Sequence, residues 1–395
     1  MRNTKKLYFF SFFWMFLVII PVIVPYFLKL GLSMSQVFQL QAIFGLGIVT
    51  LEVPTGYLCD MWGRKRSLII GSFLSGLGFT YLIFIKSFAE LVIYELIIAT
   101  ALSFVSGADI SLLYDSVDKS DRKYSTKSLA NMQFASVSGE SVASILGGAL
   151  MAFSFTHVAV ANAIAGWIPF FIALTLSEPT VERMSRSTHL ENFKEVFRHI
   201  FFCKDKILFF SFINLIIWGL ATFIAVWLFQ KYWADRGISL TYFGIIWAIY
   251  NISVGITGKQ VHRLEHKIGA IPLLLFLSIA PVLGYLGMAK SAGFIGVAFG
   301  LLFYLSRGVT QILLKDALNW RIPSKFRATA NSLQSFFFRL GFAIIGPLVG
   351  YGVDTYGMDT TLLSLGAVFI GMIFFTTFPL VKEIRKLKIE EIPLP

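Results

Sequence analysis

The stretch GYLCDMWGRKRSL, residues 56–68, places one acid and three consecutive cations between two long apolar runs. Charge is scarce elsewhere, because only 14% of the 395 residues are charged and 56% are hydrophobic. With 16% aromatic residues and a mean hydropathy of +0.74, an ordinary soluble domain could not present this surface to water. Apolar runs of about 20 residues match a helix that crosses a bilayer. The composition therefore predicts an integral membrane protein.

The apolar runs predict an all-α protein with twelve transmembrane helices. A run such as FFSFFWMFLVIIPVIV, residues 9–24, lacks the alternation that strands of a membrane barrel require. The predicted spans are 7–29, 36–58, 67–86, 88–116, 129–151, 157–177, 207–233, 239–258, 270–289, 292–316, 328–351 and 358–380.

The distribution of Lys and Arg predicts the orientation. Of 34 such residues, 27 lie at the two termini and in every second loop, five lie on the opposite side, and two lie within spans. Under the positive-inside rule both termini are cytoplasmic, and we expect a bacterial inner (plasma) membrane. The net charge of +12 then indicates a lipid bilayer and not nucleic acid as the partner. Both cysteines, Cys59 and Cys203, fall on the cytoplasmic side, where a structural disulfide is not expected, and no spacing suits a metal.

The chain repeats itself with an offset of 202 residues, which predicts two pseudo-symmetric six-helix halves. The opening motif has a counterpart in GKQVHRLEHKIG, where Gly258, His262 and Lys267 stand for Gly56, Asp60 and Lys65. The expected division is an N-terminal half (1–177), a cytoplasmic linker with an amphipathic helix (178–206), a C-terminal half (207–380) and a cytoplasmic tail (381–395).

These features resemble the major facilitator superfamily of secondary transporters. Its signature between helices 2 and 3 is GxLxDxxGRKxxL, and residues 56–68 match it, with Met61 at a position that is usually basic. The resemblance implies twelve helices around a central cavity, alternating access, and a cytoplasmic latch between the halves. The residues carried over to the latch are Gly56, Asp60, Gly63, Arg64 and Lys65, with Asp115 as the partner of Arg64. The alternative is that the three cations only set topology.

Charges inside spans are costly, so they predict functional positions. Asp109 and Glu140 are expected to carry protons or to gate, and Glu52 and Glu95 are weaker candidates for coupling. Arg307 and Arg339 are predicted to bind substrate or to gate. The fixed offset places Arg307 four residues from the level of Asp109 and Arg339 three residues from the level of Glu140. Acids and arginines would therefore meet around the central cavity. A structural ion pair or a buried structural acid is the alternative in each case.

Polar and aromatic side chains near these charges are additional predicted substrate contacts. They are Tyr304 and Gln311 beside Arg307, Asn214 with Trp218, and Trp247 with Asn251. Ala135, Gly139, Ala143 and Gly147 recur every four residues and predict close helix packing. This span resembles in part the glycine-rich motif of drug/proton antiporters, without its Gly-Pro pair.

The sequence has no GxSxG, Walker loop or HExxH motif, so we expect neither an enzyme nor a cofactor. The prediction is a proton-coupled secondary transporter of a small organic solute, functional as a monomer. Efflux of drug-like or metabolite substrates is the leading interpretation. Two arginines leave open an anionic, carboxylate-rich solute such as a siderophore or organic acid. A non-transporting membrane receptor or a channel is the alternative of another class.

Overall fold

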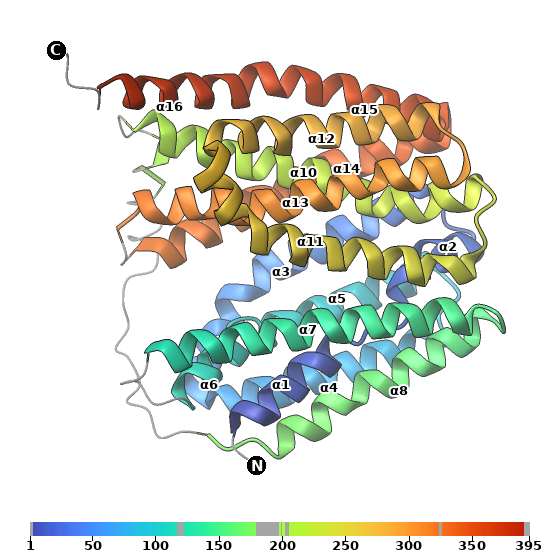
Figure 1. The fold of residues 1–395 in the computed structure, drawn as a ribbon. Coiled ribbons are helices and arrows are strands. Elements are labelled where there is room, and N and C mark those ends of the chain that lie inside the picture. The colour runs from blue at the N-terminus through green and yellow to red at the C-terminus, as the bar shows by residue number, and fades with distance from the viewer. Residues whose placement is uncertain are drawn as a thin grey trace. The chain divides into compact units, whose positions relative to one another are not determined.

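A computed structural model of the chain describes residues 3–116, 122–178, 197–198, 200–201, 205–323 and 326–390. Within these ranges the regular structure is helical, without strands (Figure 1). The chain divides into two compact units, one formed by residues 1–185 and 238–249 and the other by 186–237 and 250–395. This division differs from the predicted halves in one segment, because residues 238–249 cluster with the first unit.

The first unit is built from α1 to α8. The bounds are α1 Asn3–Trp14, the 3-10 turn η1 Ile20–Val22, α2 Ile23–Lys29, α3 Met34–Trp62, α4 Arg64–Leu82, α5 Phe88–Val105, α6 Ala108–Asp115, α7 Arg122–Leu150 and α8 Phe155–Leu174. Capping boxes fix the starts of α3 and α5, where Ser33 pairs with Gln36 and Ser87 pairs with Glu90.

Two predicted spans of this unit are interrupted, which corrects their prediction as continuous helices. Span 7–29 breaks after Trp14, and the N–H of Ile19 in the break donates to Oδ1 of buried Asn162 at 3.2 Å. A backbone group freed inside a membrane needs such a partner. Span 88–116 breaks between α5 and α6 at Gly107, whose φ of 79° suits glycine.

The second unit contains most of α10 to α16. The bounds are α10 Lys206–Asp235, α11 Leu240–Ile268, α12 Ala270–Lys290, α13 Gly293–Arg321, α14 Arg327–Tyr356, α15 Met358–Met372, the π-helix η3 Ile373–Thr377 and α16 Phe378–Glu390. Helix α16 continues into the predicted tail as far as Glu390. The sequence of this segment is rich in Lys, Glu and Leu, which favour a helix. Most of the predicted linker helix lies outside the described residues. Phe201 at its end packs against Phe212 and Phe337.

The first helix of each unit is tied by a polar residue at its start. In the first unit, Asn3 Nδ2 donates to Ser116 Oγ at 3.2 Å, at the end of α6. In the second unit, Asp205 caps α10 and accepts from Arg321, at the end of α13, at 2.8 Å. Partial burial acts to raise the pKa of Asp205, but hydrogen bonds from Leu208 N–H and Arg321 outweigh it and hold the pKa below its usual value. Ionised Asp205 therefore stabilises the folded state. This stabilisation is fully present above the pKa of Asp in the unfolded chain, and it is lost as pH falls through the lower pKa of the folded state.

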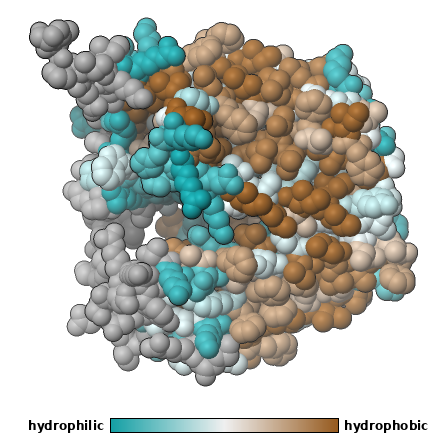
Figure 2. Space-filling model, viewed as in Figure 1, coloured by the Kyte–Doolittle hydropathy of each residue, from teal (hydrophilic) through white to brown (hydrophobic). Residues whose placement is uncertain are grey.

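Nine helical segments of the described ranges are long and apolar enough to cross a membrane. The other three predicted spans correspond to the broken segment of α1 and α2, to α4, and to α7 with its many polar residues. Hydrophobic side chains cover much of the helix surfaces in Figure 2, and hydrophilic ones gather toward helix ends. The prediction of an all-α multi-pass membrane protein is confirmed.

The repeat is present in the helix lengths, but its offset differs from the predicted 202. Helix α11 begins and ends 206 residues after α3, and α13 begins 205 residues after α5. The extra residues amount to about one helical turn. Gly63 and Gly269, both at positive φ, are therefore equivalent, and His266 takes the place of Asp60. The predicted equivalence of Asp60 with His262 was wrong.

Candidate functional site

The loop between α3 and α4 holds an ion pair that ties α4 to α6. Nη1 of Arg64 pairs with Oδ2 of Asp115, and the same nitrogen donates to the carbonyl of Ser111 at 2.8 Å. The side chains are 28% and 10% exposed, so the pair is partly shielded from water. The side chain of Asp60 lies outside the described residues. A Cβ added to Gly56 would meet no described atom within 4 Å.

Glu178 completes this loop and was not predicted from the sequence. Its carboxylate accepts from the backbone N–H of Arg64 at 2.8 Å and of Lys65 at 2.6 Å, which are the first N–H groups of α4. Glycine is required at position 63 for two reasons. Its φ is 97°, and a Cβ there would lie 3.0 Å from the Glu178 carboxyl. The only sign of this role in the sequence is that Glu178 directly follows the sixth predicted span.

Arg64→Ala should lower the free energy of unfolding by about 1–3 kcal/mol and impair transport, because it leaves Asp115 without its cation. Adding Asp115→Ala should recover part of the loss. Thermal unfolding in detergent and solute flux measure the two effects. Arg66→Ala is the matched control, since Arg66 is exposed and adjacent in the same loop. Equal behaviour of Arg64→Ala and Arg66→Ala would leave the loop as a topology signal.

Glu95 is the most deeply buried acid among the described residues. It is 4% exposed, and its Oε1 accepts from Nε2 of Gln41 at 2.9 Å, which is itself 6% exposed. No described cation forms an ion pair with it. Gln41 was not predicted from the sequence. It lies eight residues after the capping serine of α3, and Glu95 lies eight residues after that of α5. Both helices begin at the same side of the membrane, so the two side chains lie at the same depth.

The other predicted acids have different surroundings. Asp109 lies in the first turn of α6, where its Oδ1 accepts from the N–H of Ile110 at 2.7 Å. Glu140 on α7 accepts from Nε1 of Trp247 at 3.3 Å. Glu52 on α3 is exposed. Trp247 therefore contacts an acid of the first unit, a partner that sequence spacing alone could not identify. Asn251, one turn after Trp247, is half-buried.

Asn214 and Trp218 belong to a closed network around the π-helix η3. Oδ1 of Asn214 accepts from Nε1 of Trp218 at 2.9 Å and from Oγ1 of Thr377 at 2.8 Å, and its Nδ2 donates to the carbonyl of Thr376 at 2.9 Å. Both Asn214 and Trp218 are 0% exposed. Their polar atoms are already used to hold the extra residue of the π-helix, so we assign them a structural role instead of the predicted substrate contact.

Asn214→Leu should lower the free energy of unfolding by about 2–3 kcal/mol, because buried donors lose their acceptor. Transport per folded molecule should stay near that of the wild type. Ser364→Ala is the control, since this exposed hydroxyl bonds only its own helix. A changed solute affinity at unchanged stability would restore the substrate contact.

The predicted site residues of α13 differ in burial and in their neighbours. Tyr304 is 1% exposed, with its ring centroid 4.8 Å from that of Tyr250, whereas Arg307 is half-buried. Gln311 lines a cleft of about 770 Å³ within the second unit, with His262 and Glu265 of α11 in its wall. On α14, Arg339 Nε lies 3.4 Å from Ser335 Oγ. The predicted meeting of the arginines with the acids stays a prediction.

The small-residue pattern on α7 packs as predicted. A Cβ on Gly139 would lie 2.1 Å from the carbonyl oxygen of Phe12, and one on Gly147 would lie 2.0 Å from that of Val18. On the neighbouring face, Gly148 meets Thr241 and Gly244 at the start of α11. Backbones approach this closely only without side chains.

A family model described as the Major Facilitator Superfamily matches residues 7–319. The chain belongs to the major facilitator superfamily. An uncharacterized MFS-type transporter, YxaM of Bacillus subtilis (strain 168), is 24% identical over 377 residues and covers 92% of each chain. The protein is thus a multi-pass membrane transporter of the major-facilitator type, as the resemblance of residues 56–68 indicated.

Solved structures share this fold at low identity. The nucleoside transporter NupG matches with a TM-score of 0.78 at 16% identity, covering 96% of this chain and 99% of NupG. A POT family transporter in complex with 5-aminolevulinic acid has a TM-score of 0.75 at 12% identity, covering 96% of each chain. A bacterial homolog of the human lysosomal transporter Spinster, inward-facing and unoccupied, has a TM-score of 0.74 at 14% identity, covering 99% and 98%. At these identities the likeness concerns the fold.

Proposed function

We propose that this transporter is proton-coupled and moves a small organic solute by alternating access, with Glu95 as its proton-carrying group. The supporting observation is a carboxyl that is 4% exposed, lies within a membrane span and has a neutral amide as its hydrogen-bond partner. Burying an ionised carboxylate without a cation is costly. A carboxyl that is neutral when sealed and ionised when hydrated carries one proton in each cycle.

Gln41 suits this role because an amide serves both protonation states. Its NH2 group donates to an ionised carboxylate, as the 2.9 Å contact has it, and its carbonyl accepts from a protonated carboxyl after rotation about the last side-chain bond. A lysine in this position would hold Glu95 ionised. Asp109 and Glu140 complete the proposal as secondary gating acids, since both lie on membrane helices of the same unit.

The proposed alternative of an anionic solute is supported by Arg307 of α13. Arg307 is half-buried and hydrogen-bonds no described residue, so its guanidinium is free for an anionic or zwitterionic solute. Efflux of drug-like or metabolite substrates remains the leading direction, and it rests on the resemblance of the loop motif. We place both termini in the cytoplasm of a bacterial inner membrane and take the monomer as the working unit.

Flux into proteoliposomes under an imposed pH gradient tests the proposal. The solutes tested are polycarboxylates and organic cations. Nucleosides and 5-aminolevulinic acid are also tested, because the names of two structurally similar transporters include them. The expected result is saturable flux of one class that responds to the gradient. Flux that neither saturates nor responds would indicate a channel, and no flux of any class would favour a receptor.

A further inference from the structure

One face of α11 changes from apolar to basic along its length. Large apolar side chains at spacings of three and four residues are about half exposed on this face. They are Ile245 at 49%, Ile249 at 54%, Ile252 at 48% and Ile256 at 55%. The same spacing continues through Lys259, Arg263 and Lys267, all exposed. Residues three and four apart share a helix face, so the isoleucines and cations form one continuous strip.

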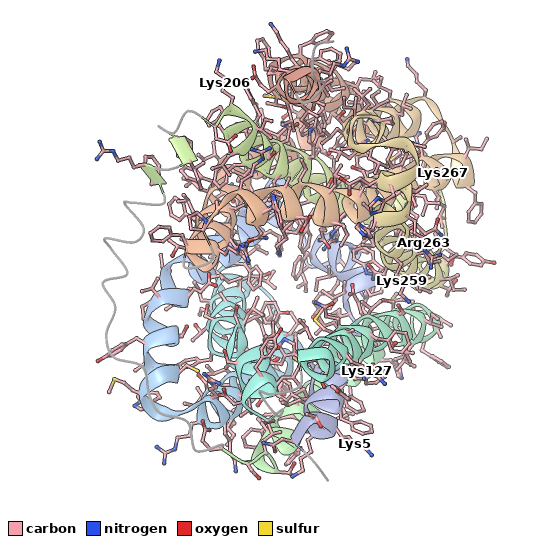
Figure 3. All side chains as sticks on the ribbon, turned by 60° about the vertical axis from the view of Figure 1, so that its left-hand side comes forward. Lys5, Lys127, Lys206, Lys259, Arg263 and Lys267 are labelled. Atoms are coloured by element: carbon pink, nitrogen blue, oxygen red, sulfur yellow. The ribbon has the colours of Figure 1, made fainter. Side chains whose placement is uncertain are left out.

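The change occurs at the depth where a bilayer core would end. Lys259 lies 19 residues after the start of α11 at Leu240. At the α-helical rise this is about 28 Å, close to the thickness of a hydrocarbon core. The four isoleucines thus fall within the core and the cations begin at its boundary. Figure 3 shows Lys259, Arg263 and Lys267 on successive turns at the end of α11, and Figure 2 shows teal there and brown toward its start.

The three cations have no partner among the described residues. None forms an ion pair or a hydrogen bond there, although five other ion pairs are present in the described ranges. The one acid of α11, Glu265, follows Arg263 by two residues, a turn of about 200° that places it on another side of the helix. It lines the cleft of the second unit instead. Among the described residues, therefore, no acid compensates the positive charge of the strip.

We propose that this strip binds an anionic phospholipid, with its phosphate held by Lys259 and Arg263 and its acyl chains along the four isoleucines. Lys267 adds charge at the outer edge. The joined apolar and cationic surfaces match the two parts of one lipid molecule, whereas a free phosphate would use only the cations. The site depends on the proposed orientation only for naming the leaflet, which is the cytoplasmic one. It does not depend on proton coupling.

Photocrosslinking tests the site on the full-length protein in proteoliposomes. Phosphatidylglycerol carrying a diazirine in its acyl chain is compared with the matching phosphatidylcholine, and crosslinked peptides are mapped by mass spectrometry. We expect phosphatidylglycerol to label residues 249–256 about tenfold or more above phosphatidylcholine. Each cation near the surface contributes roughly fivefold. Lys259→Gln with Arg263→Gln should therefore remove the preference.

Two further variants separate the strip from general positive charge. Arg263→Gln with His262→Arg keeps the number of cations at this helix end but moves one of them about 100° around α11, and should lower the preference roughly fivefold. Lys259→Arg with Arg263→Lys should keep it and shows that the fold tolerates changes here. Equal labelling by both lipids, or a preference that is unchanged in the moved-charge variant, would overturn the proposal. Full competition by inorganic phosphate at constant ionic strength would also overturn it, because the site would then take a free anion.

Discussion

We expect Glu95→Gln to abolish accumulation of the solute driven by a pH gradient while exchange of solute across the membrane continues. Glutamine preserves the shape and the contact with Gln41 but cannot release a proton. A gradient of one pH unit supports roughly a tenfold concentration ratio at one proton per solute, since about 1.4 kcal/mol corresponds to tenfold. That ratio should fall to about one in the variant. Exchange should persist, because it moves no net proton.

Glu90→Gln is the matched control on the same helix. Glu90 lies in the first turn of α5, where it completes a capping box with Ser87, and glutamine also suits that position. This control should accumulate solute as the wild type does. Accumulation by Glu95→Gln at the wild-type level would remove Glu95 from the coupling mechanism and return attention to Asp109 and Glu140.

Gly244→Val should reduce transport by about tenfold or more through loss of the close contact between α7 and the start of α11. A Cβ on Gly244 would lie 2.0 Å from the carbonyl oxygen of Ser144, and one on Gly148 would lie 2.7 Å from that of Thr241. The backbones must therefore separate. A steric cost of about 1.4 kcal/mol or more in one transport state already changes its population tenfold.

The control for this substitution is Gly255→Val on the same helix, where a Cβ meets no described atom within 4 Å. It should transport normally and remain as stable as the wild type. Solute flux and thermal unfolding of the two variants give the comparison. Normal flux in Gly244→Val would mean that the contact can open without consequence for the cycle.

Much of the fold was predictable because long apolar runs and loop charges follow from the bilayer. The breaks at residues 15–19 and at Gly107 were not, because they depend on partners from distant segments, such as Asn162 for Ile19. The repeat offset was predicted to be 202, whereas the helix starts give 205 or 206, because apolar runs locate the ends of helices only to within several residues. Helix ends with glycine at positive φ, such as Gly63 and Gly269, align the repeat better than apolar runs do.

The candidate site was predictable in part. Arg64 and Asp115 were paired from a motif, but Glu178 required the geometry of the α4 N-terminus. From the sequence, Glu95 is a weaker candidate than Asp109 and Glu140, because burial is not visible in a sequence. Its pairing with Gln41 depends on equal depth in α3 and α5, and two serine capping boxes at matching distances were an unused signal for it.

We propose that solute movement carries a proton through Glu95. The direct measurement is the change in internal pH of proteoliposomes, recorded with a trapped dye, when the transported solute is added without an imposed gradient. We predict a saturable, solute-dependent pH change in the wild type and none in Glu95→Gln, which still exchanges solute. A wild type that moves solute without any pH change would exclude proton coupling, and a Glu95→Gln variant with the full pH change would exclude Glu95 as the proton carrier.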